Sequence, residues 1–116
     1  MNSDVFVWDI IKRGEQQGVP SWICKLQQNE IDALVEKQRC SVHTNVVDES
    51  YITFLEQQIS LGARGPQWSG ILKKRIDELK RFIGKNVSTV MFACDEVTVT
   101  IRIDPEMETI LFVEVV

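Results

Sequence analysis

The spacing of apolar residues changes near Ser88, and this change constrains the fold more than any other feature of the chain. Beyond Ser88 the apolar and polar residues alternate, as in VTVTIRI (97–103), where Thr98, Thr100 and Arg102 separate four β-branched apolar residues. Alternation with period two is typical of a half-buried antiparallel strand. The last quarter of the chain is therefore predicted to be β-structure.

Two further strand-like segments flank this stretch. STVMFAC (88–94) precedes it and is separated from it by the polar pair Asp95-Glu96, whereas TILFVEVV (109–116) follows after the loop DPEMET. Three consecutive strands with short links favour an antiparallel meander.

Upstream of the meander, apolar residues recur at helical spacing. Asp48 is a predicted N-cap for ESYITFLEQQIS (49–60), and Gly62 stands where a helix-ending glycine belongs. A helix that buries Ile31, Leu34 and Val35 is predicted to begin at an Asn29 N-cap.

Three segments give weaker patterns. Residues 4–17 show helical spacing after Ser3, and we predict a helix, but the β-branched content suits a strand equally well. SWICKL (21–26) is predicted to be extended, and SVHTNVV (41–47) to be a strand or an extended connection.

A basic helix is predicted over residues 66–84. Pro66 suits its first turn, and an apolar stripe is predicted to form the core face: Trp68, Leu72, Ile76, Leu79 and Ile83. Its charged residues lie off this stripe, and Lys74–Glu78 and Asp77–Arg81 are spaced for i,i+4 pairs.

Helices followed by strands, without alternation between them, indicate an α+β fold. We predict one domain over residues 1–116, in which a layer of three to four helices packs on a C-terminal three-stranded antiparallel meander. The 116 residues allow a single core.

The charge of the chain is polarised. The net charge is -4, yet the stretch from Arg64 to Lys85 is predominantly basic and the remainder is strongly acidic. A net negative charge disfavours general coating of nucleic acids, which depends on positive charge. The acids of the C-terminal meander concentrate near its two turns: Asp95, Glu96, Asp104, Glu106 and Glu108.

No sequence motif indicates catalysis. The glycines form no phosphate-binding loop, and Cys40 and His43 lack the local partners that a zinc site or a nucleophilic cysteine would have. We expect no catalytic residue, no cofactor and no metal. The odd number of cysteines, the absence of a long apolar run and an acidic N-terminal segment favour a cytoplasmic protein without a membrane partner.

In size, acidity and layout the whole chain resembles the small immunity proteins of bacterial toxin–immunity pairs, including those of contact-dependent growth inhibition. The resemblance implies a cytosolic α+β domain that binds a cognate toxin, often a basic nuclease, and blocks its active site. On this view Asp95, Glu96, Asp104, Glu106 and Glu108 are candidate partner-binding residues. The alternative is a small regulatory or phage-type protein that binds nucleic acid through the basic helix 66–84.

Overall fold

The structure, a computed structural model, describes residues 3–62 and 65–116, with side chains from Val7 onward. The chain divides into two compact units. Unit 1 joins the N-terminal segment, up to Asn45, to the C-terminal segment Asn86–Val116, and unit 2 is the intervening stretch Val46–Lys85.

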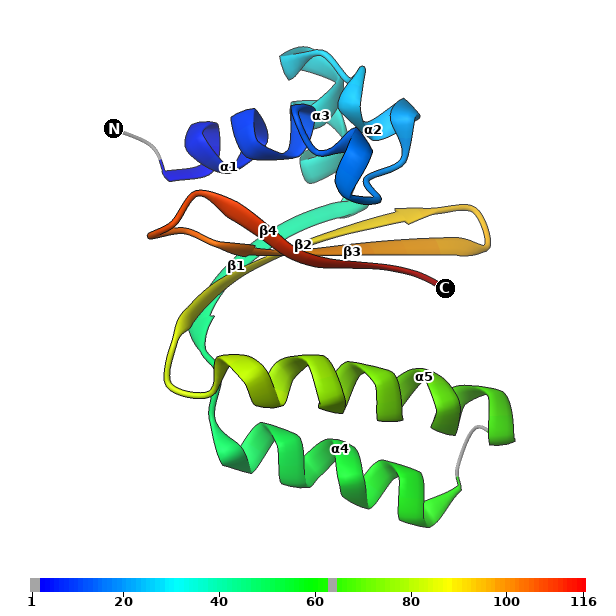
Figure 1. The fold of residues 1–116 in the computed structure, drawn as a ribbon. Coiled ribbons are helices and arrows are strands. Elements are labelled where there is room, and N and C mark those ends of the chain that lie inside the picture. Colours follow the sequence, from blue (N-terminus) through cyan, green and yellow to red (C-terminus); the bar gives the residue numbers. More distant parts are fainter. Residues whose placement is uncertain (1–2, 63–64) are drawn as a thin grey trace. The chain divides into compact units, whose positions relative to one another are not determined.

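Unit 1 contains three helices and a sheet of four strands. The helices are α1 (Ser3–Lys12), α2 (Ser21–Cys24) and α3 (Gln28–Glu36), with a 3-10 turn at Glu15–Gln17. The sheet has the order β1-β2-β3-β4 and is formed by β1 (Cys40–Val46), β2 (Asn86–Cys94), β3 (Val97–Asp104) and β4 (Thr109–Val115). The three helices cover one face of this sheet (Figure 1).

The α+β class and the C-terminal meander are confirmed. The described residues form five α-helices where three to four were predicted, and the sheet has one strand more than predicted. β2 pairs with β3, and β3 with β4, in antiparallel register. The additional strand β1 lies beside β2, where Ala93 N donates to Arg39 O at 2.9 Å and the Thr44 and Ser88 hydroxyls are 2.9 Å apart. Because the whole of unit 2 separates β1 from β2, no short link in the sequence indicates this pairing.

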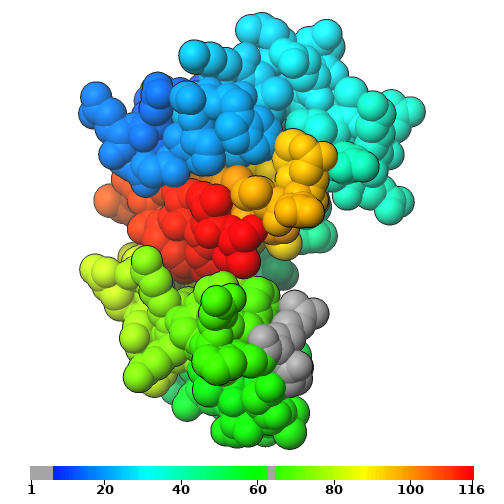
Figure 2. Space-filling model, turned by 90° about the vertical axis from the view of Figure 1, so that its right-hand side faces the viewer, coloured from blue at the N-terminus to red at the C-terminus, as the bar shows by residue number. Residues whose placement is uncertain are grey.

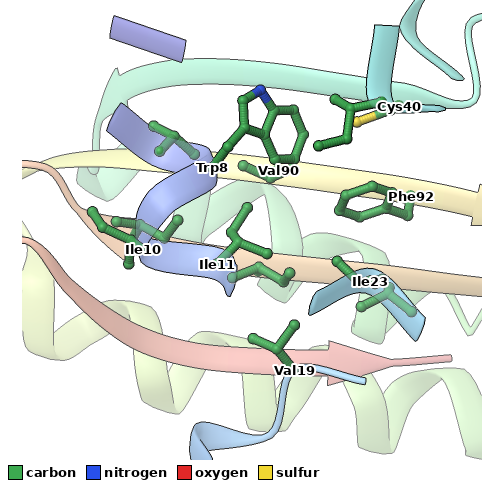
Figure 3. Close-up of a cluster of buried hydrophobic side chains, with 13 residues drawn as sticks. Trp8, Ile10, Ile11, Val19, Ile23, Cys40, Val90 and Phe92 are labelled. Atoms are coloured by element: carbon green, nitrogen blue, oxygen red, sulfur yellow. The ribbon is translucent and has the colours of Figure 1, made fainter. Parts of the chain in front are cut away.

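The core of unit 1 lies between the helices and the sheet (Figure 3). Val90 of β2 pairs with Ile101 of β3, and both are fully buried. Trp8 of α1 meets the ring of Phe92 edge-on, with 5.8 Å between ring centroids. Helix α1 confirms the helix predicted at the N-terminus, although it ends at Lys12 and not at residue 17. Its Ile10 and Ile11 are buried in this core.

Two local predictions in unit 1 are wrong. SWICKL is not extended, because the Pro20 carbonyl accepts from the backbone N–H groups of Ile23 and Cys24 and starts the short helix α2. Helix α3 has its N-cap at Gln27, whose backbone N–H donates to Glu30 Oε1 at 3.1 Å, and not at Asn29. Val35, predicted to be buried, is 48% exposed.

Unit 2 is a helical hairpin formed by α4 (Glu49–Leu61) and α5 (Gly65–Leu79), which pack side by side (Figure 1). The predicted caps of α4 are confirmed: the Asp48 carboxylate accepts from Tyr51 N at 2.9 Å, and Gly62 has φ +60°. Two backbone hydrogen bonds, Val47 N to Lys85 O and Gly84 N to Val47 O, join the ends of the hairpin.

The basic helix is shorter than predicted. It ends at Leu79 and continues as a 3-10 turn over Lys80–Phe82, so Ile83 lies outside the helix and is 42% exposed. Of the other residues predicted on the core face, Leu72, Ile76 and Leu79 are buried, whereas Trp68 is only partly buried.

Candidate binding surfaces

The five predicted partner-binding acids fall at opposite ends of strand β3. Asp95 and Glu96 form the turn between β2 and β3, whereas the other three belong to the loop between β3 and β4. An eight-residue strand spans about 23 Å, and Figure 1 shows the two connections at opposite ends of the strands. The structure therefore groups these acids as two separate sets.

Asp104 has a structural role in the second set. Its Oδ1 accepts from the backbone N–H groups of Glu106 at 3.0 Å and Met107 at 3.1 Å, and the residue is 5% exposed. A carboxylate that accepts backbone bonds two and three residues ahead fixes the conformation of a turn. Asp104 thus shapes this loop, and Glu106 and Glu108 are its surface carboxylates.

Met107 stands between the exposed Glu106 and Glu108 and is itself 68% exposed. Glu108 has φ +57°, a left-handed conformation that sharpens the turn before β4. The β3–β4 loop therefore presents one flexible apolar side chain flanked by two carboxylates. The sequence pattern indicated the acids of this loop but not the exposure of its methionine.

The β2–β3 turn is shorter than the β3–β4 loop. Cys94 pairs directly with Val97, which leaves Asp95 and Glu96 as the two connecting residues. Asp95 has φ +53°, and aspartate is among the residues that adopt this conformation most readily. Both side chains are exposed.

Trp22 of α2 lies at this same end of the sheet. Its ring meets Phe92 edge-on, with centroids 6.0 Å apart, and 42% of the residue is exposed. All three tryptophans lie near apolar residues in the sequence, a pattern that favours the core, but only Trp8, at 5% exposure, is buried there. The short helix α2 turns Trp22 outward while its neighbour Ile23 enters the core.

Arg102 is buried, although its position in VTVTIRI predicts a solvent-facing side chain. It is 6% exposed, and its Nη1 lies 2.8 Å from Glu114 Oε1. The guanidinium carbon is 5.1 Å from the centroid of the Phe112 ring, directly across the β3–β4 ladder. The prediction that β3 has one buried and one solvent-facing side is therefore wrong from Val99 to Asp104, where both faces are buried. Glu114 within the apolar run ILFVEVV was the available clue to a buried ion pair.

The basic residues of α5 and its 3-10 extension are exposed: Lys73, Lys74, Lys80 and Arg81. Arg81 Nη1 contacts Glu78 Oε2 at 3.5 Å, an i,i+3 pair in place of the predicted i,i+4 pairing with Asp77. Arg75 lies over the Trp68 ring at 5.9 Å. Arg64, which contributes to the basic stretch in the sequence, is outside the described residues.

The thiols and the histidine do not converge. Cys40 is buried in the core, and burial raises its pKa to about 11, whereas His43 is exposed. Burial also raises the pKa of Cys24, with a smaller effect of Glu15, and the Cys24 thiol donates to Ile11 O. Within residues 3–62 and 65–116, no three His, Cys, Asp or Glu side chains come together as metal ligands.

None of the described helices is both long and apolar enough to cross a bilayer. A scan of the chain against protein-family models gave no match, and neither did searches of curated proteins and of solved structures.

Proposed function

We propose that the chain is an inhibitory binding protein of the immunity type, which neutralises a cognate, basic bacterial toxin in the cytoplasm through a stoichiometric complex. The observation that supports this proposal most is that four carboxylates of the two turns are exposed and have no ion-pair or hydrogen-bond partner within the described residues. They belong to Asp95, Glu96, Glu106 and Glu108.

Such carboxylates are available to a positively charged partner. Charges at the rim of an interface speed association and select the partner, and close ion pairs across an interface can couple strongly. The turns also hold these charges on short, well-defined connections, so little conformational freedom is lost on binding. Recognition therefore requires no change in the core of unit 1.

The test is capture of a partner from the native host, or with the product of the adjacent upstream gene, followed by calorimetry on charge variants. The first variant combines Glu96→Lys with Asp95→Asn. Asparagine is chosen at position 95 because it tolerates the positive φ of that residue. The matched variant at the other end is Glu106→Lys with Glu108→Asn. We expect 1:1 binding that weakens at least tenfold in one of the two variants and becomes less dependent on salt.

Unchanged affinity and salt dependence in both folded variants would contradict the involvement of the acidic turns. Failure of the unmodified chain to form any stoichiometric protein complex would contradict the proposed function itself.

The alternative function, nucleic-acid binding through the basic helix 66–84, is favoured by one observation, the exposure of Lys73, Lys74, Lys80 and Arg81. A mobility-shift assay at about 0.15 M salt separates the two functions. Micromolar retention of nucleic acid that disappears when these four residues are changed to Glu would replace the first proposal by the second.

A further inference from the structure

The end of the sheet that carries the β2–β3 turn combines a partly exposed tryptophan with two carboxylates that form no ion pair within the described residues. Phe92 and Cys94 of β2 project from the same face of the sheet, because side chains alternate along a strand. Val97 is the partner of Cys94 and is 43% exposed. The apolar surface of this face therefore extends past the core as far as the turn.

Trp22 extends this apolar surface on the side of the helices. Its contact with Phe92 places the indole ring above the last part of β2, and three residues of strand, or about 10 Å, separate Phe92 from Asp95. In Figure 2 the orange end of the β2–β3 hairpin stands beside the light-blue residues of the α2 region. We name the exposed residues of this area the Trp22 surface: Trp22, Val97, Asp95 and Glu96.

The charge of the Trp22 surface is not neutralised by the chain itself. One base, Arg39, lies beside the end of β2, since its backbone carbonyl accepts from Ala93 N at 2.9 Å. Arg39 is exposed, and in the described structure it forms no ion pair with Asp95 or Glu96. Both carboxylates thus remain available at the end of the sheet where the Trp22 indole is partly exposed.

An exposed indole and adjacent carboxylates match the chemistry of an arginine side chain. The guanidinium group stacks on aromatic faces and forms bidentate hydrogen bonds with carboxylates, while its methylene stem packs on apolar surface. Tryptophan is also among the residues that most often dominate binding energy at interfaces. A lysine would meet the charge but would lose the planar stacking and the bidentate geometry.

We propose that the Trp22 surface is a docking site for an arginine side chain of a protein partner, with the guanidinium over the Trp22 ring and against the carboxylates of Asp95 and Glu96. This inference rests on the proposed function, because it specifies the chemistry by which a basic partner is recognised. It also assigns different roles to the two acidic ends of β3, because the ring contact of Trp22 is with Phe92, near the β2–β3 turn.

The experiment is an NMR titration that needs no identified partner. The probe is the N-acetylated, C-amidated peptide Gly-Arg-Leu-Arg-Gly, and the matched peptides carry Lys or Glu in place of Arg. We expect the arginine peptide to shift the Trp22 indole N–H and the backbone amides of Asp95 and Glu96, in proportion to peptide concentration. The indole signals of Trp8 and Trp68 and the amides of Glu106 and Glu108 should move little.

Two variants test the geometry of the site. Trp22→Leu keeps an apolar contact with Phe92 but removes the aromatic face, and Asp95→Asn with Glu96→Gln removes the charge while tolerating the turn. We expect each to weaken peptide binding about two- to fivefold, as exposed cation–π contacts and surface ion pairs do. The lysine peptide should bind more weakly than the arginine peptide, and the glutamate peptide should cause no shift at these positions.

The inference is wrong if the arginine peptide leaves the Trp22 indole N–H unmoved, or if it shifts the β3–β4 loop as strongly as the β2–β3 turn. It is also wrong if a captured partner binds the Trp22→Leu and Asp95→Asn/Glu96→Gln variants with the affinity of the unmodified chain. In that last case the proposed function stands and only the position of the contact changes.

Discussion

Two glycines show how strongly the consequence of one added methyl group depends on position. A Cβ at Gly70, inside helix α5, would meet no atom within 4 Å, whereas a Cβ at Gly14 would clash with the side chain of Ile110 and lie 2.8 Å from Val19 Cγ2. Glycine inside a helix costs about 0.5–1 kcal/mol relative to alanine. Overpacking of a buried position costs about 1–3 kcal/mol.

We therefore expect Gly70→Ala to raise the free energy of unfolding by about 0.5–1 kcal/mol and Gly14→Ala to lower it by about 1–3 kcal/mol. Urea denaturation followed by circular dichroism measures both changes on the same scale. Equal effects of the two substitutions would show that the close contacts around Gly14 relax without cost.

The stability of helix α4 is linked to pH through its N-cap. The pKa of Asp48 is lowered by the hydrogen bond from the Ser50 hydroxyl and then by that from Tyr51 N. Because the folded state favours the ionised carboxylate, the stabilisation is complete above the ordinary pKa of 3.8. It is lost as the pH falls from that value through the lower pKa of the folded state.

Asp48→Ala is accordingly expected to lower the Tm at neutral pH, and the difference from the unmodified chain should shrink as the pH falls below 3.8. Thermal melts at a series of pH values measure this difference. Gln57→Ala, a substitution in the same helix that removes no titratable group, serves as the control. A difference that stays constant into the acid range would contradict the role of the Asp48 charge.

The elements with strong local patterns were predictable from the sequence, and the others depended on distant contacts. Asp48 and Gly62 delimit α4 through chemistry that involves only their neighbours. Strand β1, in contrast, is defined by its pairing with β2, from which unit 2 separates it in sequence. Val35 fitted a helical apolar stripe and is nevertheless exposed, because spacing shows that a face exists and not how much of it is covered.

The candidate site was predictable only in part, for a similar reason. The sequence indicated which acids lie near turns, and because β3 runs from one turn to the other, the two turns lie at opposite ends of the sheet. The sequence did not distinguish Asp104 from Glu106 and Glu108. The Asp104 carboxylate accepts backbone hydrogen bonds within its own loop, whereas the other two carboxylates are exposed. Nor could the sequence bring Trp22 next to Phe92, because that contact joins residues 70 positions apart.

At the scale of the whole molecule, the question is whether the two compact units unfold together. Every residue of the large buried cluster belongs to unit 1, from Val7 in α1 to Ile103 in β3. Unit 2 is a two-helix hairpin of about 40 residues, a length at which chains rarely bury enough surface to fold alone. The hydrogen bonds between Val47, Gly84 and Lys85 fix the ends of this hairpin where β1 ends and β2 begins.

We therefore expect one cooperative thermal transition for the full chain, as the prediction of a single domain over residues 1–116 requires. Helix loss at 222 nm and the near-ultraviolet signal of the buried Trp8 should change at the same Tm, because we expect a two-helix hairpin of this length to be unstable alone. A peptide of residues 46–85 alone should be largely unstructured in water, since isolated short helices are marginal there. Two separated transitions, together with a helical peptide, would show that unit 2 is a domain of its own.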